Sequence, residues 1–211
     1  KDKKKVETSL KEGKKEEWKL SEVKETNAKK SPRAPFITST LQQAASSRLG
    51  YSPSQTMMHA QRLYEAGLIT YMRTDSTTLS SNAQKQAQAI IAKNYGKEYL
   101  QSRVFKGKSK NAQEAHEAIR PSNLNIESAG KIAQQQKIYQ LIYQRTLASQ
   151  MSDAKVLKTK VIIKFDNKDL PNFSINGSRL LFDGWLKIDT FAKNEDTILP
   201  KIQENDILNL L

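Results

Sequence analysis

The chain has 211 residues and a formal net charge of +13 at pH 7, with 35 basic against 22 acidic side chains. No run approaches the roughly 18 apolar residues of a membrane-spanning helix, and no signal-peptide pattern opens the chain, so we expect no membrane partner. Because the chain has no cysteine, disulfides and thiolate metal sites are excluded, and the composition fits a cytoplasmic protein.

The positive charge gathers in the middle of the chain. Residues 36–157 carry 15 basic and 7 acidic side chains, whereas residues 158–211 carry 8 of each. A polyanion such as nucleic acid would therefore be held most readily by the middle part. The alternative, that the lysines only keep a helical surface soluble, stays open at this point.

The first residues are expected to begin a β domain. Residues 1–15 are rich in lysine and low in complexity, which predicts a frayed or solvated segment. Trp18 and Leu20 alternate with charged residues, and this pattern indicates an edge strand. Pro32 and Pro35 then interrupt regular structure and indicate a crossing into a second domain.

Capping signals predict two helices after this crossing. The first is expected to begin at a capping box of Ser39 and Gln42 and to end at Gly50. The second begins at a capping box of Ser52 and Gln55. The pair has helix-turn-helix spacing, and with a strand predicted after it the whole resembles a winged-helix unit. Helical hairpins are also common in packed bundles, so this pattern alone is not specific for DNA.

The sequence then changes from helical to strand periodicity. Ser81 and Gln84 indicate a third helix, and residues 134–152 form a long one. The segment between these two helices is basic and mostly irregular. Strands are predicted at 156–165, 182–188 and 206–211, together with a hairpin over 173–182 whose turn is Asn176-Gly177.

These elements predict an α+β fold, in which a mainly helical domain with a helix-turn-helix or winged-helix-like unit is inserted into an antiparallel β domain. The expected boundaries are 1–30 for the first part of the β domain, 31–157 for the helical domain and 158–211 for the second part of the β domain.

The segment GLITYMRTDS, residues 67–76, combines a strand pattern with reactive side chains. In an extended chain Ile69, Tyr71, Arg73 and Asp75 would share one face. A tyrosine hydroxyl with its ordinary pKa of about 10 is a poor nucleophile, but a nearby guanidinium favours the phenolate and can clamp a phosphate with two hydrogen bonds. Asp75 could orient Arg73 or simply turn the chain. A packing tyrosine beside a surface Arg-Asp pair is the plainer interpretation of the same residues.

Several ordered blocks favour the catalytic interpretation. GLITYMRTDS closely resembles the active-site segment of the bacterial DNA topoisomerase I family, which is of type IA. The surrounding residues 34–80, the block QEAHEAIRPS at 113–122, LASQM at 147–151 and LLFDGWLKI at 180–188 are similar to the same family in the expected order. The resemblance covers roughly residues 18–211.

The resemblance implies transient cleavage of one DNA strand. Carried onto this chain, Tyr71 is the nucleophile that forms a 5′-phosphotyrosine bond, and Arg73 is the phosphate clamp. His116 and Arg120 lie in the matched HEAIRP block, which implies phosphate contacts or orientation of the site. A histidine held by its neighbours in a loop is the alternative for His116, and His59 is expected to pack or to lie on the surface.

The family's Mg²⁺ is held by carboxylates with an Asp-x-Asp pattern in a separate domain, and no two of the nine aspartates here are separated by one residue. The resemblance therefore implies the central gate portion of the enzyme, with no metal ligand in this chain and no activity by itself. The implied partners are single-stranded and negatively supercoiled DNA and the missing domains of the same polypeptide. The implied location is the cytoplasm, in association with the nucleoid.

Three alternatives remain. Within the family, a topoisomerase III-like decatenase is the nearest rival, although a proline is usual there at the position of Met72. A non-catalytic DNA-binding winged-helix module would have kept the fold and lost the chemistry, and the presence of Tyr71 and Arg73 together weighs against it. A pure scaffold is a third, less favoured possibility.

Overall fold

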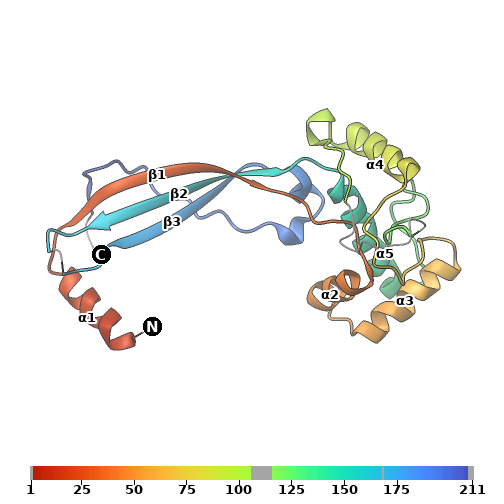
Figure 1. Cartoon of the computed structure of the whole chain (residues 1–211), viewed down its shortest axis with the longest axis horizontal. Helices are drawn as coiled ribbons and strands as arrows, with labels where there is room; N and C mark the ends of the chain where they lie inside the picture. The colour runs from red at the N-terminus through yellow and green to blue at the C-terminus, as the bar shows by residue number, and fades with distance from the viewer. Residues whose placement is uncertain (1, 106–115, 168, 209–211) are drawn as a thin grey trace. The chain divides into compact units, whose positions relative to one another are not determined.

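The computed structural model describes residues 2–105, 116–167 and 169–208. Contacts between residues divide the chain into two compact units, which are coloured by residue number in Figure 1. The sheet unit comprises Lys1–Lys30, Lys155–Phe182 and Asn194–Leu211, and the helical unit comprises Ser31–Ala154 and Asp183–Lys193. Helices and an antiparallel sheet confirm the α+β class. No helix in the described parts of the chain is long and apolar enough to cross a membrane.

In the described part of the helical unit, the helices α2, α3 and α4 pack around α5. Ile138 and Ile142 of α5 are fully buried, and α5 contacts each of the other three helices. The order of elements is α2 (Thr38–Leu49), α3 (Pro53–Glu65), α4 (Ser81–Asn94), the short 3-10 helix η1 (Lys97–Tyr99) and α5 (Ala133–Ser149).

The helix ends test the capping predictions. The box of Ser52 and Gln55 is confirmed, since the Gln55 amide donates to Ser52 Oγ at 3.2 Å and the Ser52 amide donates to Gln55 Oε1 at 3.0 Å. Gly50 ends α2 with a φ of +70°, as predicted. The predicted cap at Ser39 is wrong, because α2 begins at Thr38 and the Ile37 amide donates to Thr40 Oγ1. Helix α4 is capped by Ser80, one residue before the predicted cap.

The segment after β3 packs into the helical unit rather than forming the strand predicted at 182–188. It holds two 3-10 helices, η2 (Gly184–Lys187) and η3 (Thr190–Ala192). Trp185 is 3 % exposed, and its amide donates to the Ser152 carbonyl at 3.0 Å. Gly184 lies against the backbone of residues 152–153 with a φ of +50°, a close approach that a side chain would obstruct.

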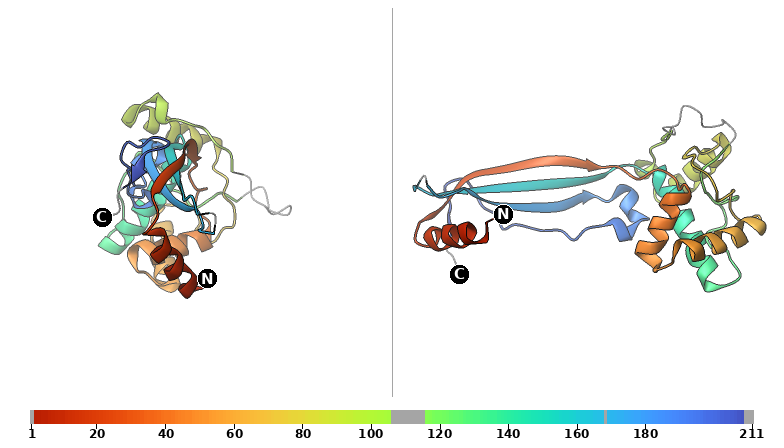
Figure 2. Two further views of the ribbon diagram at one scale, coloured as in Figure 1. Left: turned by 90° about the vertical axis from the view of Figure 1, so that its left-hand side faces the viewer. Right: turned by 60° about the horizontal axis from the view of Figure 1, so that its bottom comes forward.

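The sheet unit contains a four-stranded antiparallel sheet in the order β3-β2-β1-β4, in which β1, β2 and β3 run side by side (Figures 1 and 2). In β2, Thr159, Val161 and Ile163 are less exposed than Lys158, Lys160 and Lys164 beside them, as the alternation predicts. The strands are β1 (Trp18–Lys30), β2 (Ala154–Lys164), β3 (Phe173–Phe182) and β4 (Ile207–Leu208).

Three expectations about the sheet unit are wrong. The lysine-rich start is the helix α1 (Lys3–Gly13), capped by Asp2, which accepts from the Lys4 amide. The strand predicted around Trp18 is present as β1, but it is not an edge at Trp18 and Lys19, because these two residues pair with β4. Asn176-Gly177 is not a turn, because β3 continues through it and pairs with β2 along its length. Gly177 instead allows the segment at Thr197–Leu199 to pass close to the strand.

A buried cluster of charges lies in the helical unit. Arg48 donates to both carboxylate oxygens of Asp189 at 2.8 and 3.0 Å, and Asp189 is 3 % exposed. Arg145, on α5, is 5 % exposed and its guanidinium lies 4.1 Å from the centre of the Phe36 ring. Burial lowers the pKa of Arg145 to about 10, an effect that the charge of Asp189 opposes. Asp189 is therefore the counter-charge of the buried Arg145 and of the half-buried Arg48.

Candidate active site

The segment that carries Tyr71 is irregular, so the predicted strand is wrong. Only Ile69 forms a β-bridge, with Pro121, and the chain bends at Met72 and Arg73. The predicted alternation nevertheless holds from Tyr71 onward, where exposed and buried residues alternate as far as residue 76. Ile69 is the exception, because it is 2 % exposed and packs inward instead of sharing the face of Tyr71.

The chain before Tyr71 is held by the segment at residues 118–122. The Thr70 amide donates to the Arg120 carbonyl at 2.9 Å, and the Arg120 amide donates to Thr70 Oγ1 at 3.0 Å. Thr70 Oγ1 also lies 2.7 Å from the Ala118 carbonyl, to which it donates. The Ser122 amide donates to the Leu68 carbonyl at 3.0 Å. Hydrogen bonds to residues 118–122 therefore hold the backbone before Tyr71, as a neighbouring strand in a sheet would.

The chain after Tyr71 is held by the first residue of α2. Thr38 Oγ1 donates to the Met72 carbonyl at 2.8 Å and lies 3.1 Å from the Thr74 carbonyl. The Thr74 amide donates to Thr38 Oγ1 at 3.0 Å, and the Thr38 amide donates to the Thr74 carbonyl at 3.0 Å. Tyr71 and Arg73 therefore lie on a short backbone segment that is fixed on both sides.

The HEAIRP block forms one side of this site. Arg120 contacts Glu117 at 2.6 Å and donates to the Pro121 carbonyl at 2.9 Å, so its guanidinium is engaged within its own segment. Glu117 also accepts from the Ser80 amide at 2.7 Å. Burial alone would raise the pKa of Glu117, but the hydrogen bonds from Arg120 and Ser80 and the charge of Arg120 outweigh it, and the pKa is lowered. His116 is exposed at the start of the block.

The side chains of the site differ in their contacts. Tyr71 is 46 % exposed, and its ring lies 5.2 Å from that of Tyr64 on the last turn of α3, at an interplanar angle of 64°. Arg73 and Asp75 are both exposed, and in the described part of the chain no ion pair joins them. The charge of Arg73 is therefore free to meet an anion from solvent, and Asp75 does not hold it.

Most of the residues that the sequence predicts for the site lie in one neighbourhood, and other residues beside them were not predicted. The structure brings Tyr71, Arg73, Asp75 and the block at 117–122 into one neighbourhood through backbone bonds. His59 is 8 % exposed and faces Tyr51 at 5.9 Å between ring centres, so it packs as expected. Thr38, Thr70 and Tyr64 were missed. Tyr64 could have been found from the sequence, because it lies in the last turn of the helix that leads into the tyrosine segment.

The described residues offer few ligands to a metal ion. Among the described residues no group of three or more His, Cys, Asp or Glu side chains is placed to hold a metal ion. The residues of the tyrosine site supply one exposed carboxylate, that of Asp75, and an arginine, which does not bind cations.

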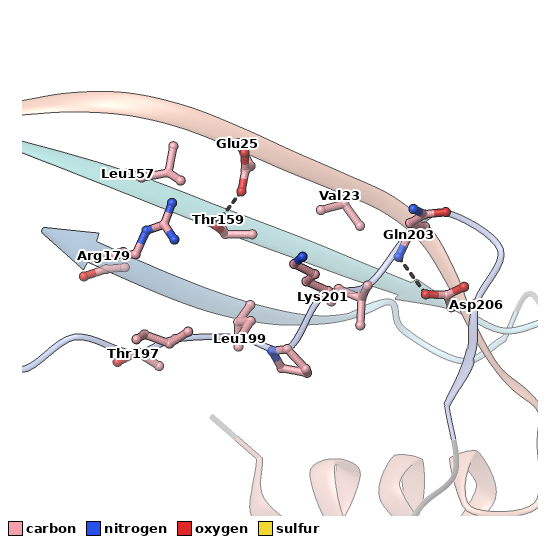
Figure 3. A pocket seen from close by; sticks show the side chains of 14 residues that line it. Val23, Glu25, Leu157, Thr159, Arg179, Thr197, Leu199, Lys201, Gln203 and Asp206 are labelled. Carbon is pink, nitrogen blue, oxygen red and sulfur yellow. Dashed lines mark hydrogen bonds between the residues drawn. The ribbon is translucent and has the colours of Figure 1, made fainter. Parts of the chain in front are cut away.

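The sheet unit has a hollow of about 490 Å³ on one face of the sheet, beneath the segment at 197–203 (Figure 3). It mixes apolar side chains such as Val23 and Leu157 with charged ones such as Glu25 and Arg179. Thr159 donates to Glu25 at 3.4 Å across this face. None of the predicted site residues lines it, since all of them belong to the helical unit.

Comparison with known proteins defines the class of protein to which this fold and site belong. A family model described as DNA topoisomerase, for the bacterial enzymes, matches residues 1–211, and the chain belongs to this family.

Individual relatives agree with the family match. The chain is 49 % identical over 196 residues to DNA topoisomerase 1 of Vibrio cholerae, with 90 % of this chain and 22 % of the relative covered. It is 48 % identical over 196 residues to DNA topoisomerase 1 of Escherichia coli, with the same coverage. It is 43 % identical over 223 residues to DNA topoisomerase 1 of Helicobacter pylori strain J99, with 99 % of this chain and 30 % of the relative covered.

A solved structure is also similar. The full-length topoisomerase I of Thermotoga maritima superposes with a TM-score of 0.79 at 36 % identity, covering 95 % of this chain and 34 % of that one. The chain thus spans about a quarter to a third of the length of the relatives that it matches.

Proposed function

We propose that Tyr71 is the nucleophile of a type IA DNA topoisomerase that relaxes negative supercoils. The observation that carries this proposal is the exposure of Tyr71 and Arg73 on a backbone segment held on both sides. In the reaction the Tyr71 phenolic oxygen attacks a phosphodiester phosphorus and loses its proton, and the bond from phosphorus to the 3′ oxygen breaks. The 3′ oxygen takes up a proton, and the 5′ end stays linked to Tyr71 until the reverse reaction reseals the strand.

The free guanidinium of Arg73 supplies positive charge for this step. Charge gathers on the non-bridging phosphoryl oxygens in the transition state, and two parallel N–H donors of one arginine can bind them. Asp75 and His116 are exposed in the same region and are proposed to contact DNA or orient it. Arg120 is proposed to orient the site, because its backbone holds Thr70 while Glu117 occupies its guanidinium.

The remaining parts of the machinery are proposed to lie in the rest of the polypeptide. Mg²⁺ would be bound there by carboxylates and would bring the charge neutralisation that a phosphodiester requires. In this chain, residues 31–157 would be the helical DNA-binding domain, with α2 and α3 as a helix-turn-helix or winged-helix-like unit, inserted between β-domain parts at 1–30 and 158–211. The complete enzyme would act in the bacterial cytoplasm on single-stranded regions of negatively supercoiled DNA.

A covalent-capture experiment tests the proposal. The complete polypeptide that contains these 211 residues is incubated with Mg²⁺ and a single-stranded oligonucleotide labelled at its 3′ end, and the reaction is stopped with detergent. We expect labelled protein with the unchanged sequence and with Tyr64→Phe, and none with Tyr71→Phe. Tyr64 is a matched control, because it is similarly exposed and touches Tyr71. A labelled adduct in Tyr71→Phe would refute the assignment of the nucleophile.

Two further measurements separate this proposal from a non-catalytic DNA-binding module. The purified 211-residue chain alone should bind single-stranded DNA weakly, with a slope of log affinity against log salt of about −0.7 for each phosphate neutralised. It should not relax supercoiled DNA with Mg²⁺. Relaxation by this chain alone would contradict the division of labour, and absence of any adduct from the complete polypeptide would favour the module. A decatenase of the topoisomerase III kind would instead unlink catenated circles more readily than it relaxes supercoils.

A further inference from the structure

The two peptide groups that flank Arg73 are held by one side chain, that of Thr38. Its hydroxyl lies 2.8 Å from the Met72 carbonyl and 3.0 Å from the Thr74 amide. A hydroxyl has one proton to donate and two lone pairs to accept, so it can donate to Met72 and accept from Thr74 at the same time. The Thr38 amide adds a third bond, to the Thr74 carbonyl at 3.0 Å.

Thr38 belongs to a rigid part of the helical unit. It is the first residue of α2, and its close neighbours Phe36 and Leu41 are 1 % and 0 % exposed. The Phe36 carbonyl also accepts from the Ile119 amide at 2.8 Å, so the start of α2 is tied to the HEAIRP block as well. The packed start of α2 therefore fixes the position of the Met72 and Thr74 peptide groups.

Arg73 depends on this support more than its neighbours do. Met72 and Thr74 are buried at 1 % and 9 % exposure and are held by packing, whereas the exposed Arg73 side chain forms no ion pair with the described residues. The Arg73 side chain has no ion pair or hydrogen bond with the described residues. The direction in which its guanidinium leaves the chain is therefore determined by its backbone. A displacement of about 1 Å in a positioning group can reduce a reaction rate about 100-fold.

We infer that Thr38 is a positioning residue for Arg73, through hydroxyl bonds to both peptide groups that flank it. The inference rests on the proposed function of Arg73 as the phosphate clamp beside the nucleophile Tyr71. Thr38 itself touches neither DNA nor the reacting atoms in this inference, and it acts only by fixing the backbone.

The test uses the complete polypeptide and measures the single-turnover rate of adduct formation at saturating oligonucleotide. Thr38→Val keeps the shape of the side chain and removes the hydroxyl, and we expect a rate about 10- to 100-fold lower. Thr38→Ser keeps the hydroxyl and should restore most of the rate. The affinity for the oligonucleotide should change by no more than about twofold, because the phosphate contacts that dominate affinity are retained.

Thr40→Val is the matched control. The Thr40 hydroxyl bonds only the Ile37 backbone at the same helix end, at 3.0 and 3.2 Å, and does not reach the tyrosine segment. Its loss weakens the start of α2 without releasing the peptide groups beside Arg73. If Thr38→Val and Thr40→Val lower the rate equally, Thr38 acts through helix stability alone and the inference fails.

A double-mutant cycle with Arg73→Lys shows whether the effect passes through Arg73. Adding Thr38→Val to Arg73→Lys should change the rate by less than about twofold, because residues that act together are not additive. Equal effects in both backgrounds would overturn the inference, as would an unchanged rate for Arg73→Lys alone. Tyr71→Phe is run in parallel, because an adduct formed by that variant would refute the proposed function itself. If Tyr71→Phe forms no adduct but Thr38→Val reacts at the normal rate, only the positioning role of Thr38 is refuted.

Discussion

Asp189 is the counter-ion of the buried Arg145 and the half-buried Arg48, and its replacement by asparagine tests how strongly this arrangement stabilises the helical unit. Asparagine has nearly the same shape but no charge, so the change leaves Arg48 and Arg145 charged in a region where they are 12 % (for the Arg48 side chain) and 5 % exposed. The pKa of Arg145 is already lowered to about 10 by burial, with Asp189 opposing the shift. Loss of that carboxylate removes the main opposing charge.

The expected loss can be worked from the geometry. Two unit charges whose centres lie about 4 Å apart attract each other by about 4 kcal/mol when the effective dielectric constant is about 20. Breaking a buried pair by removing one partner destabilises proteins by about 3–5 kcal/mol. We therefore expect Asp189→Asn to lower the free energy of unfolding of the helical unit by about 4 kcal/mol. For a unit of this size that corresponds to a fall in Tm of about 14 °C.

The two tryptophans allow this loss to be followed in the helical unit alone. Trp18 lies in the sheet unit and Trp185 in the helical unit, so in a Trp18→Phe background the fluorescence reports only on Trp185. The control is Glu65→Gln, since Glu65 pairs with Arg62 at 3.6 Å with both side chains more than half exposed. That change should cost less than about 1 kcal/mol. A fall in Tm no larger for Asp189→Asn than for Glu65→Gln would refute the reasoning.

Three other changes have defined expectations. Gly50→Ala should lower the free energy of unfolding by about 1 kcal/mol in a urea titration, because a φ of +70° strains a residue with a side chain while no atom lies near the added carbon. Glu117→Gln should destabilise the chain by about 1 kcal/mol at pH 7; since the pKa of Glu117 is lowered in the folded state, this difference should disappear as the pH falls below the ordinary glutamate value of 4.5. Tyr64→Ala should slow adduct formation by Tyr71 about 2- to 10-fold, whereas Tyr64→Phe keeps the ring and should not; equal rates would show that the ring contact is not used.

The elements that could be predicted from sequence are those determined within one helical turn. Ser52 and Gln55 bond each other across three residues, and Gly50 adopts a conformation that few other residues tolerate, so neither depends on distant parts of the chain. The exposure of Tyr71 and Arg73 was also predictable, because burial alternates along an extended backbone even where no strand forms.

Two of the wrong predictions have a common cause in distant contacts. Asn176-Gly177 has the sequence of a tight turn, yet nine residues of β3 pair with β2 and outweigh the local preference. Residues 67–74 have the composition of a strand, yet they bond to Thr38 and to residues 118–122. The bond from Thr74 to Thr38 spans 36 residues of the sequence, and the bond from Arg120 to Thr70 spans 50. No local pattern announces such partners, and for the same reason the role of Thr38 could not be read from the sequence.

The division of the chain into two interleaved units has a consequence for how it folds. Strand β1 ends at Lys30 and its neighbour β2 begins at Ala154, so the first pairing of the sheet must wait until nearly all of the helical unit has been synthesised. Closing so long a loop of unfolded chain is slow, because its conformational entropy must be lost before the contacts between the strands can compensate for it. The contacts of Ser21 with Ile162 and of Glu25 with Thr159 show that the two strands run antiparallel, so the helical unit leaves and re-enters the sheet at the same end. A helical unit that folds first shortens this loop to a compact spacer, so the entropy cost of pairing β1 with β2 falls once the residues between them have folded.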